Sequence, residues 1–216
     1  MTTSKSEIIQ KYKKKGARKS NGTSEVVGLM LKSKKTAKLV VDLLNDKREG
    51  IRSKAAKSIA LAAKINPKMF QNFNRRLVKK LFDSTFQVVR YTTEAISHIA
   101  PRLKVFNRQD TIQQLTELLS SDSVCVRESA LVAIGRINYE QKSVQDLAFR
   151  SLSVGLRDDN LIVRKKAIMS MSEFCRNNNE YISRALLLMK DMEKDSKKSV
   201  SQEARRVIKN MKLIIN

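Results

Sequence analysis

Apolar and polar residues are arranged along this chain with a repeated pattern. An apolar residue followed by Arg, with a small residue three positions after the Arg, recurs through the sequence. The Arg stands at positions 52, 90, 127 and 164, and a fifth copy has Ser at 201, so the copies are 38, 37, 37 and 37 residues apart. A fixed period of this length is typical of repeat proteins, in which each repeat buries its apolar face against its neighbours. The copies are Ile51-Arg52 with Ala55, Val89-Arg90 with Thr93, Val126-Arg127 with Ala130, Val163-Arg164 with Ala167, and Val200-Ser201 with Ala204.

Within the copies, apolar and small residues follow the 3.6-residue period of an amphipathic helix. They stand at offsets −1, +3, +6, +7 and +10 from the Arg position, so these offsets are predicted to face the core. Gly (6) and Pro (2) are scarce, which favours helices over many short strands. The predicted helix pairs span 36–44 and 51–63, 67–82 and 87–100, 110–119 and 124–137, 143–156 and 161–175, and 181–192 and 200–214.

The segment before the first pair is predicted to differ from the rest. Residues 1–22 are rich in Lys and Arg, including Lys13, Lys14 and Lys15, and poor in apolar residues. Because little apolar burial is available to offset the entropy of ordering, we expect a flexible basic arm with at most one amphipathic turn capped by Ser6. The apolar side of this turn holds Ile8, Ile9 and Tyr12.

In the predicted helix 67–82, Phe73 and Phe82 are expected on the apolar side.

At the repeated apolar-Arg positions, the chain resembles HEAT repeats. In that family an Asp stands about six residues before the Val-Arg-x-x-Ala of the second helix. Asp46 precedes Arg52 by six residues and Asp158 precedes Arg164 by six. The resemblance implies an all-α, right-handed α-α superhelix (a HEAT-like solenoid) of about five helical-hairpin repeats over 23–216, near 36–66, 67–104, 105–141, 142–178 and 179–216. It also implies that the Arg column is a structural ladder, which bonds Asp side chains and helix ends between adjacent units. The residues of this ladder are Asp46, Arg52, Arg90, Arg127, Asp158 and Arg164.

Charge is the most unusual property of the composition. The chain has 44 Lys and Arg against 21 Asp and Glu, a formal net charge of +23, and residues 1–80 hold 22 of the basic and 5 of the acidic side chains. Such an excess is typical of proteins that bind polyanions, above all nucleic acids, although a soluble protein can also simply be basic. Two cysteines without metal-ligand spacing and no apolar run near ~18 residues favour an intracellular protein, cytoplasmic or in the nucleoid or nucleus.

The candidate binding residues lie at the outward offsets +1, +2, +5, +9 and +12 of the second helices, where Tyr91 and Tyr139 are also expected. Repeated cations along such a face match a phosphate backbone, although Glu128, Glu173 and Glu203 dilute the pattern. These cations are Lys54, Lys57, Lys64, Arg102, Arg136, Lys165, Lys166, Arg176 and Arg206, and a second cluster on a first helix comprises Arg75, Arg76, Lys79 and Lys80.

The main prediction is therefore a non-enzymatic protein that binds nucleic acid, duplex DNA rather than RNA, with little sequence preference and no cofactor or metal. Its binding surfaces are the basic concave face of the second helices and the basic N-terminal arm with Lys13, Lys14 and Lys15. An alternative is a scaffold for an acidic peptide or a helical protein partner, which an exposed apolar stripe of Leu61, Val132, Met169 and Leu213 would favour. A third hypothesis is a HEAT-like alkylpurine DNA glycosylase, although Trp is absent and His98 is the only histidine.

Overall fold

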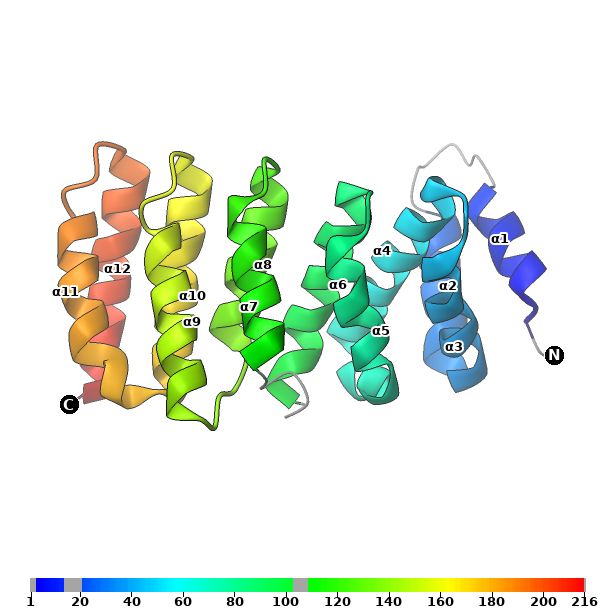
Figure 1. Ribbon diagram of the computed structural model, residues 1–216, viewed down its shortest axis with the longest axis horizontal. Helices are drawn as coiled ribbons and strands as arrows, with labels where there is room; N and C mark the ends of the chain where they lie inside the picture. The colour runs from blue at the N-terminus through cyan, green and yellow to red at the C-terminus, as the bar shows by residue number, and fades with distance from the viewer. Residues whose placement is uncertain (1–2, 14–20, 103–108, 216) are drawn as a thin grey trace. The chain divides into compact units, whose positions relative to one another are not determined.

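The computed structural model describes residues 3–13, 21–102 and 109–215, and for 21, 102, 214 and 215 only the backbone. Helices make up nearly all of these residues, and no strand occurs among them. The chain divides into two compact units, Met1–Leu103 and Lys104–Asn216, each built of stacked helix pairs (Figure 1). The prediction of an all-α, HEAT-like solenoid is confirmed. In the described ranges no helix has the length and apolar character needed to cross a membrane.

The first unit contains two complete repeats preceded by two further helices. Helices α1 (Lys5–Lys13) and α2 (Asn21–Lys32) come first, and α3 (Lys34–Asp42) with the short 3-10 helix η1 (Leu43–Asn45) pairs with α4 (Glu49–Ile65). The second repeat pairs η2 (Pro67–Phe73), α5 (Asn74–Val78) and η3 (Lys79–Phe82) with α6 (Phe86–Ile99), which the 3-10 turn η4 (Ala100–Arg102) follows. The second helices stack directly, α2 on α4 and α4 on α6.

The expectation of a flexible N-terminal arm is wrong for residues 5–13, which form α1. Ser4 and Glu7 cap this helix reciprocally, each side chain accepting a hydrogen bond from the other residue's backbone N–H, so Ser4 rather than Ser6 is the cap. Ile8 and Tyr12 are buried, and the Tyr12 hydroxyl lies 2.8 Å from that of Ser58 on α4. Two buried apolar side chains and a capping box therefore contribute to ordering this basic segment. Lys14 and Lys15 lie outside the described residues.

The first helix of the second repeat is broken into 3-10, α and 3-10 segments where one long helix was predicted. Phe70, Leu77 and Leu81 are buried in it, but Phe73 is only half-buried and Phe82 is 55% exposed. The expectation that Phe82 faces the core is therefore wrong.

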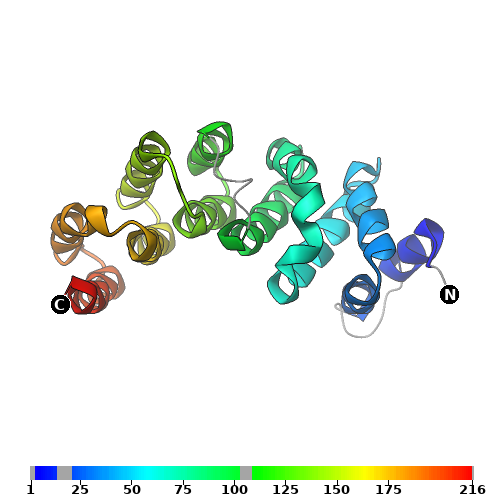
Figure 2. The same cartoon turned by 90° about the horizontal axis from the view of Figure 1, so that it is seen from below.

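The second unit contains three helix pairs in its described part. The first pair is α7 (Gln109–Glu117), continued by η6 (Leu118–Ser120), with α8 (Val124–Arg136). The second is α9 (Lys142–Gly155) with α10 (Leu161–Asn177), and the third is η7 (Asn179–Tyr181) and α11 (Ile182–Met192) with α12 (Lys198–Ile215). Figure 2 shows α9 and α11 in one layer and α10 and α12 in another.

The second helices bury the face that the sequence pattern predicts. In α4, α8 and α10 all residues at offsets −1, +3, +6, +7 and +10 are buried. The helical register does not continue past α8, because the helix stops at Arg136 and Ile137, at offset +10, already has an extended backbone. Tyr139, predicted to face outward at +12, is therefore folded back and buried, with its hydroxyl donating to the Ile134 carbonyl.

The Arg column ties the turns of neighbouring repeats together. Arg127 donates to the Asp158 carboxylate from Nε (2.7 Å) and Nη2 (3.0 Å), and its Nη1 donates to the Ser121 carbonyl (2.7 Å). Arg164 makes the same fork with the Asp195 carboxylate and the Asp158 carbonyl. Each carboxylate thus pairs with the Arg 31 residues before it, in the preceding repeat, whereas Arg164 meets Asp158, six residues before it, at the backbone carbonyl.

The first unit repeats this arrangement once. Arg52 donates to the carboxylate of Asp83 and to the carbonyl of Asp46, whose own carboxylate instead accepts from Arg48. Arg90 has no Asp at the corresponding distance, where the residue is Ser121, and its guanidinium lies 5.3 Å from the centre of the Tyr91 ring.

Candidate partner-binding surface

The predicted cations of the first unit's second helices do not form a uniform track. Lys54 donates from Nζ to the Tyr12 carbonyl at the end of α1, and Lys57 lies 5.9 Å from the Tyr91 ring centre. Lys64 is exposed, and only the backbone of Arg102 is described. At the outward offsets of α6, Thr92, Ala95 and Ile99 are buried, so the prediction that these positions face outward is wrong.

In the second unit, acidic side chains pair with several of the predicted cations. Arg176 lies 3.0 Å from Glu173, and Arg206 donates from Nε to Glu203 at 3.1 Å. The bond from Arg206 lowers the pKa of Glu203 despite the opposing effect of burial, and the charges of Lys165 and Lys166 lower it further. This face therefore carries alternating charges rather than a row of cations.

In the second predicted cluster, that of Arg75, Arg76, Lys79 and Lys80, two cations form ion pairs with described residues and two do not. Arg76 forms an ion pair with Asp42 (2.7 Å) and Lys80 with Asp83 (3.2 Å). Arg75, Lys79 and Lys13 are exposed and have no ion pair with any other described residue.

A cleft lies between α8 and α10 on the outward side of the second helices. Its volume is about 130 Å³. Met169 on α10 is 44% exposed and Val132 on α8 is half-buried, so the cleft has an apolar strip flanked by charged groups. We call it the α8–α10 cleft; it is lined by Val132, Arg136, Lys166, Met169, Ser170 and Glu173.

Gly135 explains why the two helices can approach each other here. A Cβ at this position would lie 2.5 Å from the Ser170 carbonyl oxygen and 2.9 Å from the Ser170 Cβ. Any larger residue would push α10 away from α8, because the closest atom belongs to the backbone. Val132 lies one helical turn before Gly135, and Met169 lies next to Ser170. The glycine thus fixes the spacing between Val132 and Met169. The apolar pattern of the sequence gives no signal for Gly135.

The apolar stripe predicted on this face is partly visible in each unit. Leu61 on α4 is 36% exposed and Leu213 on α12 is 71% exposed. Within the second unit, Val132 and Met169 line one cleft, whereas Leu213 lies near the end of α12 and does not line it. The cleft therefore rests on two of the four predicted apolar residues.

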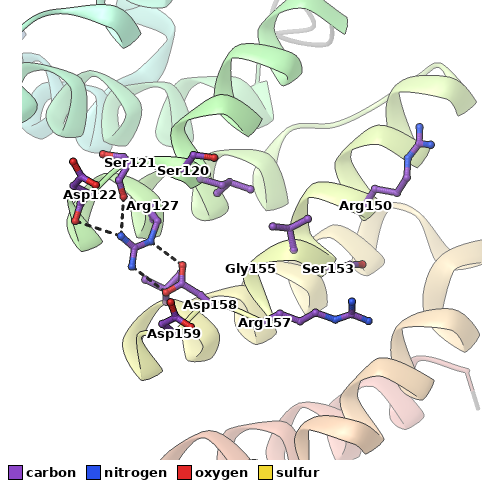
Figure 3. A pocket seen from close by; sticks show the side chains of 13 residues that line it. Ser120, Ser121, Asp122, Arg127, Arg150, Ser153, Gly155, Arg157, Asp158 and Asp159 are labelled. Carbon is purple, nitrogen blue, oxygen red and sulfur yellow. Dashed lines mark hydrogen bonds and ion pairs between the residues drawn. The ribbon is translucent and has the colours of Figure 1, made fainter.

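A larger cavity of about 780 Å³ lies beside the helix turns of the second unit. Its lining includes the Arg127–Asp158 ion pair, in which donors and acceptors already satisfy each other (Figure 3). The side chains of Arg150 and Arg157 point away from that pair. Because its polar groups do not converge on a common point, the cavity lacks the arrangement by which a small-molecule site orients its ligand.

Groups with potential chemistry are dispersed in the described part of the chain. No set of three or more His, Cys, Asp or Glu side chains is placed there to hold a metal ion. His98 is half-buried on α6, and burial raises the pKa of the Cys175 thiol to about 12, which leaves little of the reactive thiolate at neutral pH.

Comparison with known proteins reveals similarity of fold. No family model and no curated protein matches the sequence. The structure resembles an engineered protein (18% identity, 98% of this chain and 100% of that one, TM-score 0.68). It also resembles a designed armadillo repeat protein in complex with the peptide (KR)4 (20% identity, 97% and 100% covered, TM-score 0.65). An archaeal HEAT-like repeats protein from Thermococcus onnurineus NA1 is similar over the whole of both chains (13% identity, TM-score 0.59). The chain therefore has a HEAT- and armadillo-like repeat fold.

Proposed function

We propose that this protein is a binding scaffold that holds an acidic segment of a partner protein in the α8–α10 cleft. An apolar side chain of the segment enters between Val132 and Met169. Acidic side chains on either side of it meet Arg136 and Lys166. The observation that carries the proposal is the combination, in one cleft, of an exposed methionine with two cations for which no ion pair occurs among the described residues.

The size of the cleft supports a peptide rather than a small molecule. Sites for drug-sized ligands measure roughly 300–1,000 Å³, whereas this cleft measures about 130 Å³ and is suited to a single side chain. Recognition of a peptide by pockets for its side chains, with charges setting specificity, is a common mode of binding.

The local charges support a peptide over duplex DNA. Glu173 lines the cleft and Glu203 lies within the electrostatic reach of Lys165 and Lys166. A continuous phosphate backbone would meet these carboxylates, which repel it, whereas a peptide can place its acidic residues between them. A designed armadillo protein of similar fold is in complex with a basic peptide, (KR)4. The cations Arg136 and Lys166 favour the opposite charge in the partner of this protein.

Fluorescence anisotropy tests the proposal. The probe is a labelled peptide of alternating Glu and Leu, compared with a peptide in which Lys replaces Glu and with random-sequence duplex DNA. We expect saturable binding of the acidic peptide, none of the basic peptide, and no competition by duplex DNA for the acidic peptide. Equal binding of both peptides would contradict the proposed charge recognition, and full displacement by duplex DNA would favour the phosphate-binding hypothesis.

A matched pair of variants locates the site. Met169→Glu places a charge in the cleft, whereas Leu187→Glu places one at a 64% exposed leucine on α11, in the other helix layer. We expect Met169→Glu to weaken peptide binding on the order of tenfold, since a buried methionine contributes about 1.5–3 kcal/mol and part of it is already covered. Leu187→Glu is expected to bind as the parent does. Equal affinities of the two variants would exclude the cleft.

A further inference from the structure

The turn between the two helices of the second repeat exposes two phenylalanines. Phe82 at the end of η3 is 55% exposed, and Phe86 at the start of α6 is 56% exposed. Most large apolar side chains of the described residues are buried, so exposure of two aromatic rings at one turn is unusual for this protein. Isolated exposed apolar residues are common on protein surfaces, but a cluster marks a contact site.

In two of the other repeats, the position that corresponds to Phe82 is part of the core. The residue 38 positions before Phe82 is Leu44, which is 1% exposed, and the residue 74 positions after it is Leu156, which is 4% exposed. The second repeat thus places a larger ring where the first and fourth repeats bury a leucine, and turns it toward solvent. Because the Phe82 ring is exposed, the second repeat lacks the burial free energy that the leucines contribute at this position in the first and fourth repeats.

The turn that carries the rings is held firmly. The Asp83 carboxylate accepts hydrogen bonds from Arg52 (3.1 Å), from Lys80 (3.2 Å) and from the backbone N–H of Thr85 (3.1 Å). Arg52 also donates to the Thr85 hydroxyl (3.0 Å). The rings therefore flank a turn anchored on both sides, and their exposure is a fixed feature of the fold.

The same Arg52 places basic residues of the first repeat beside this turn. Its Nη1 donates to the backbone carbonyls of Asp46 and Lys47, so the turn of the first repeat lies against that of the second. Lys47 is exposed there, and Lys79 is exposed one helical turn before Phe82. Neither lysine has an ion pair with another described residue. We call Lys47, Lys79, Phe82 and Phe86 the aromatic–lysine patch.

We infer that the aromatic–lysine patch binds single-stranded nucleic acid. Bases stack on Phe82 and Phe86, and the phosphates between and beside them meet Lys79 and Lys47. Aromatic rings combined with cations along a backbone path are the arrangement by which proteins hold single strands without reading their sequence. In a duplex the bases are stacked on one another and cannot cover the rings.

Charge complementarity distinguishes this occupant from a protein segment. Residues 1–103 hold 24 Lys and Arg against 7 Asp and Glu, whereas residues 104–216 hold 20 against 14. The patch thus lies in the unit with the larger positive excess, which attracts a polyanion over distances comparable to the ionic screening length. The site is separate from the α8–α10 cleft and does not depend on the function proposed for it.

The test uses the whole protein and a short fluorescein-labelled oligothymidylate, with oligouridylate and a duplex of the same length as further probes. We expect both single strands to bind more tightly than the duplex, and a similar affinity of the two would show that the 2′-hydroxyl is not recognised. The variant Phe82→Leu/Phe86→Leu keeps apolar surface but removes the rings, and should weaken single-strand binding by roughly 10-fold or more. Ile65→Ala, which truncates a 65% exposed side chain of the same unit, is the control and should bind as the parent does.

Three results would overturn the inference. Unchanged single-strand affinity of the double leucine variant would show that stacking does not contribute. Duplex binding as tight as single-strand binding would show that charge alone accounts for the affinity. Binding of the acidic Glu-Leu peptide that falls in the double variant but not in Met169→Glu would assign the patch to a protein partner. Circular dichroism of each variant shows that it is folded, which is expected because the substituted side chains are largely in solvent.

Discussion

The Arg127–Asp158 rung allows a quantitative test of what holds the repeats together. The Asp158 carboxylate accepts two hydrogen bonds from Arg127 and one from the backbone N–H of Asn160 (2.8 Å). The two side chains are 15% and 13% exposed, so the pair is largely removed from water. The substitution Asp158→Ala leaves the Arg127 guanidinium bonded to the Ser121 carbonyl but without a counter-charge.

The expected loss follows from these contacts. Removing one partner of a buried ion pair costs about 3–5 kcal/mol, and hydrogen bonds to charged groups contribute about 1.5–3 kcal/mol. Since water still reaches the edge of this pair, we expect Asp158→Ala to lower the free energy of unfolding by about 2–4 kcal/mol. The backbone carbonyl of Asp158 still accepts from Arg164, so the neighbouring rung should persist.

The neighbouring residue supplies the control. Asp159 is exposed; its backbone carbonyl accepts from Arg164 at 3.0 Å, and its carboxylate acts on the Arg side chains only through its charge. Asp159→Ala should therefore change the free energy of unfolding by no more than about 0.5 kcal/mol. Urea denaturation followed by circular dichroism measures both variants, and a double-mutant cycle of Asp158→Ala with Arg127→Met isolates the pair. If the two alanine variants are equally stable and the cycle gives no coupling, the rung does not stabilise the array.

Three further predictions concern packing and pH. Gly135→Ala brings a Cβ to within 2.5 Å of a carbonyl oxygen and should destabilise the protein by about 1–3 kcal/mol while weakening binding at the cleft, as denaturation and peptide anisotropy would show. Tyr12→Phe removes a hydroxyl that bonds to buried Ser58 and should cost about 1 kcal/mol, with faster proteolysis of the segment around α1; parental proteolysis would mean that α1 is not held by this bond. Burial raises the pKa of Asp83 and Asp158, but hydrogen bonds from the Arg side chains, the backbone N–H groups and, for Asp83, Lys80 outweigh it together with the nearby positive charges, so both pKa values lie below the usual range. The stabilisation by these carboxylates is present above about pH 4 and is lost as pH falls through the folded pKa. Denaturation at decreasing pH should show this loss, and Asp158→Ala should lose part of the pH dependence.

The sequence alone predicts the second helices well for a physical reason. Burial of one face requires apolar residues with the helical period, so the offsets from Arg52, Arg127 and Arg164 identify core residues directly. The spacing of Asp and Arg predicts the ladder residues but not their partners. A carboxylate six residues before an Arg and one 31 residues after it are equally compatible with the sequence, and only the stacking of repeats places the second within reach.

Other features depend on backbone geometry that periodicity does not encode. The first helix of the second repeat contains 3-10 segments and leaves Phe82 exposed, and α8 ends before the register reaches Tyr139. The position of α1 depends on Gly22, where a Cβ would lie 2.3 Å from the Lys11 carbonyl oxygen. Such a close backbone approach has no signal in an amphipathic pattern, although a glycine inside a helix is an indication of it.

The cations behind the net charge of +23 have different roles, which depend on their partners in the structure. Arg52, Arg127 and Arg164 are 12–15% exposed and bound to carboxylates, so their removal should lower stability rather than affinity. Other cations, such as Arg176, are neutralised by nearby glutamates at the surface. The cations with no ion pair among the described residues include those of the α8–α10 cleft and the aromatic–lysine patch, and both surfaces would respond to salt. The salt dependence of binding therefore does not distinguish the two. Each surface also holds a distinct uncharged group, a methionine in one and phenylalanines in the other, so substitution of these groups tells which anionic partner binds where.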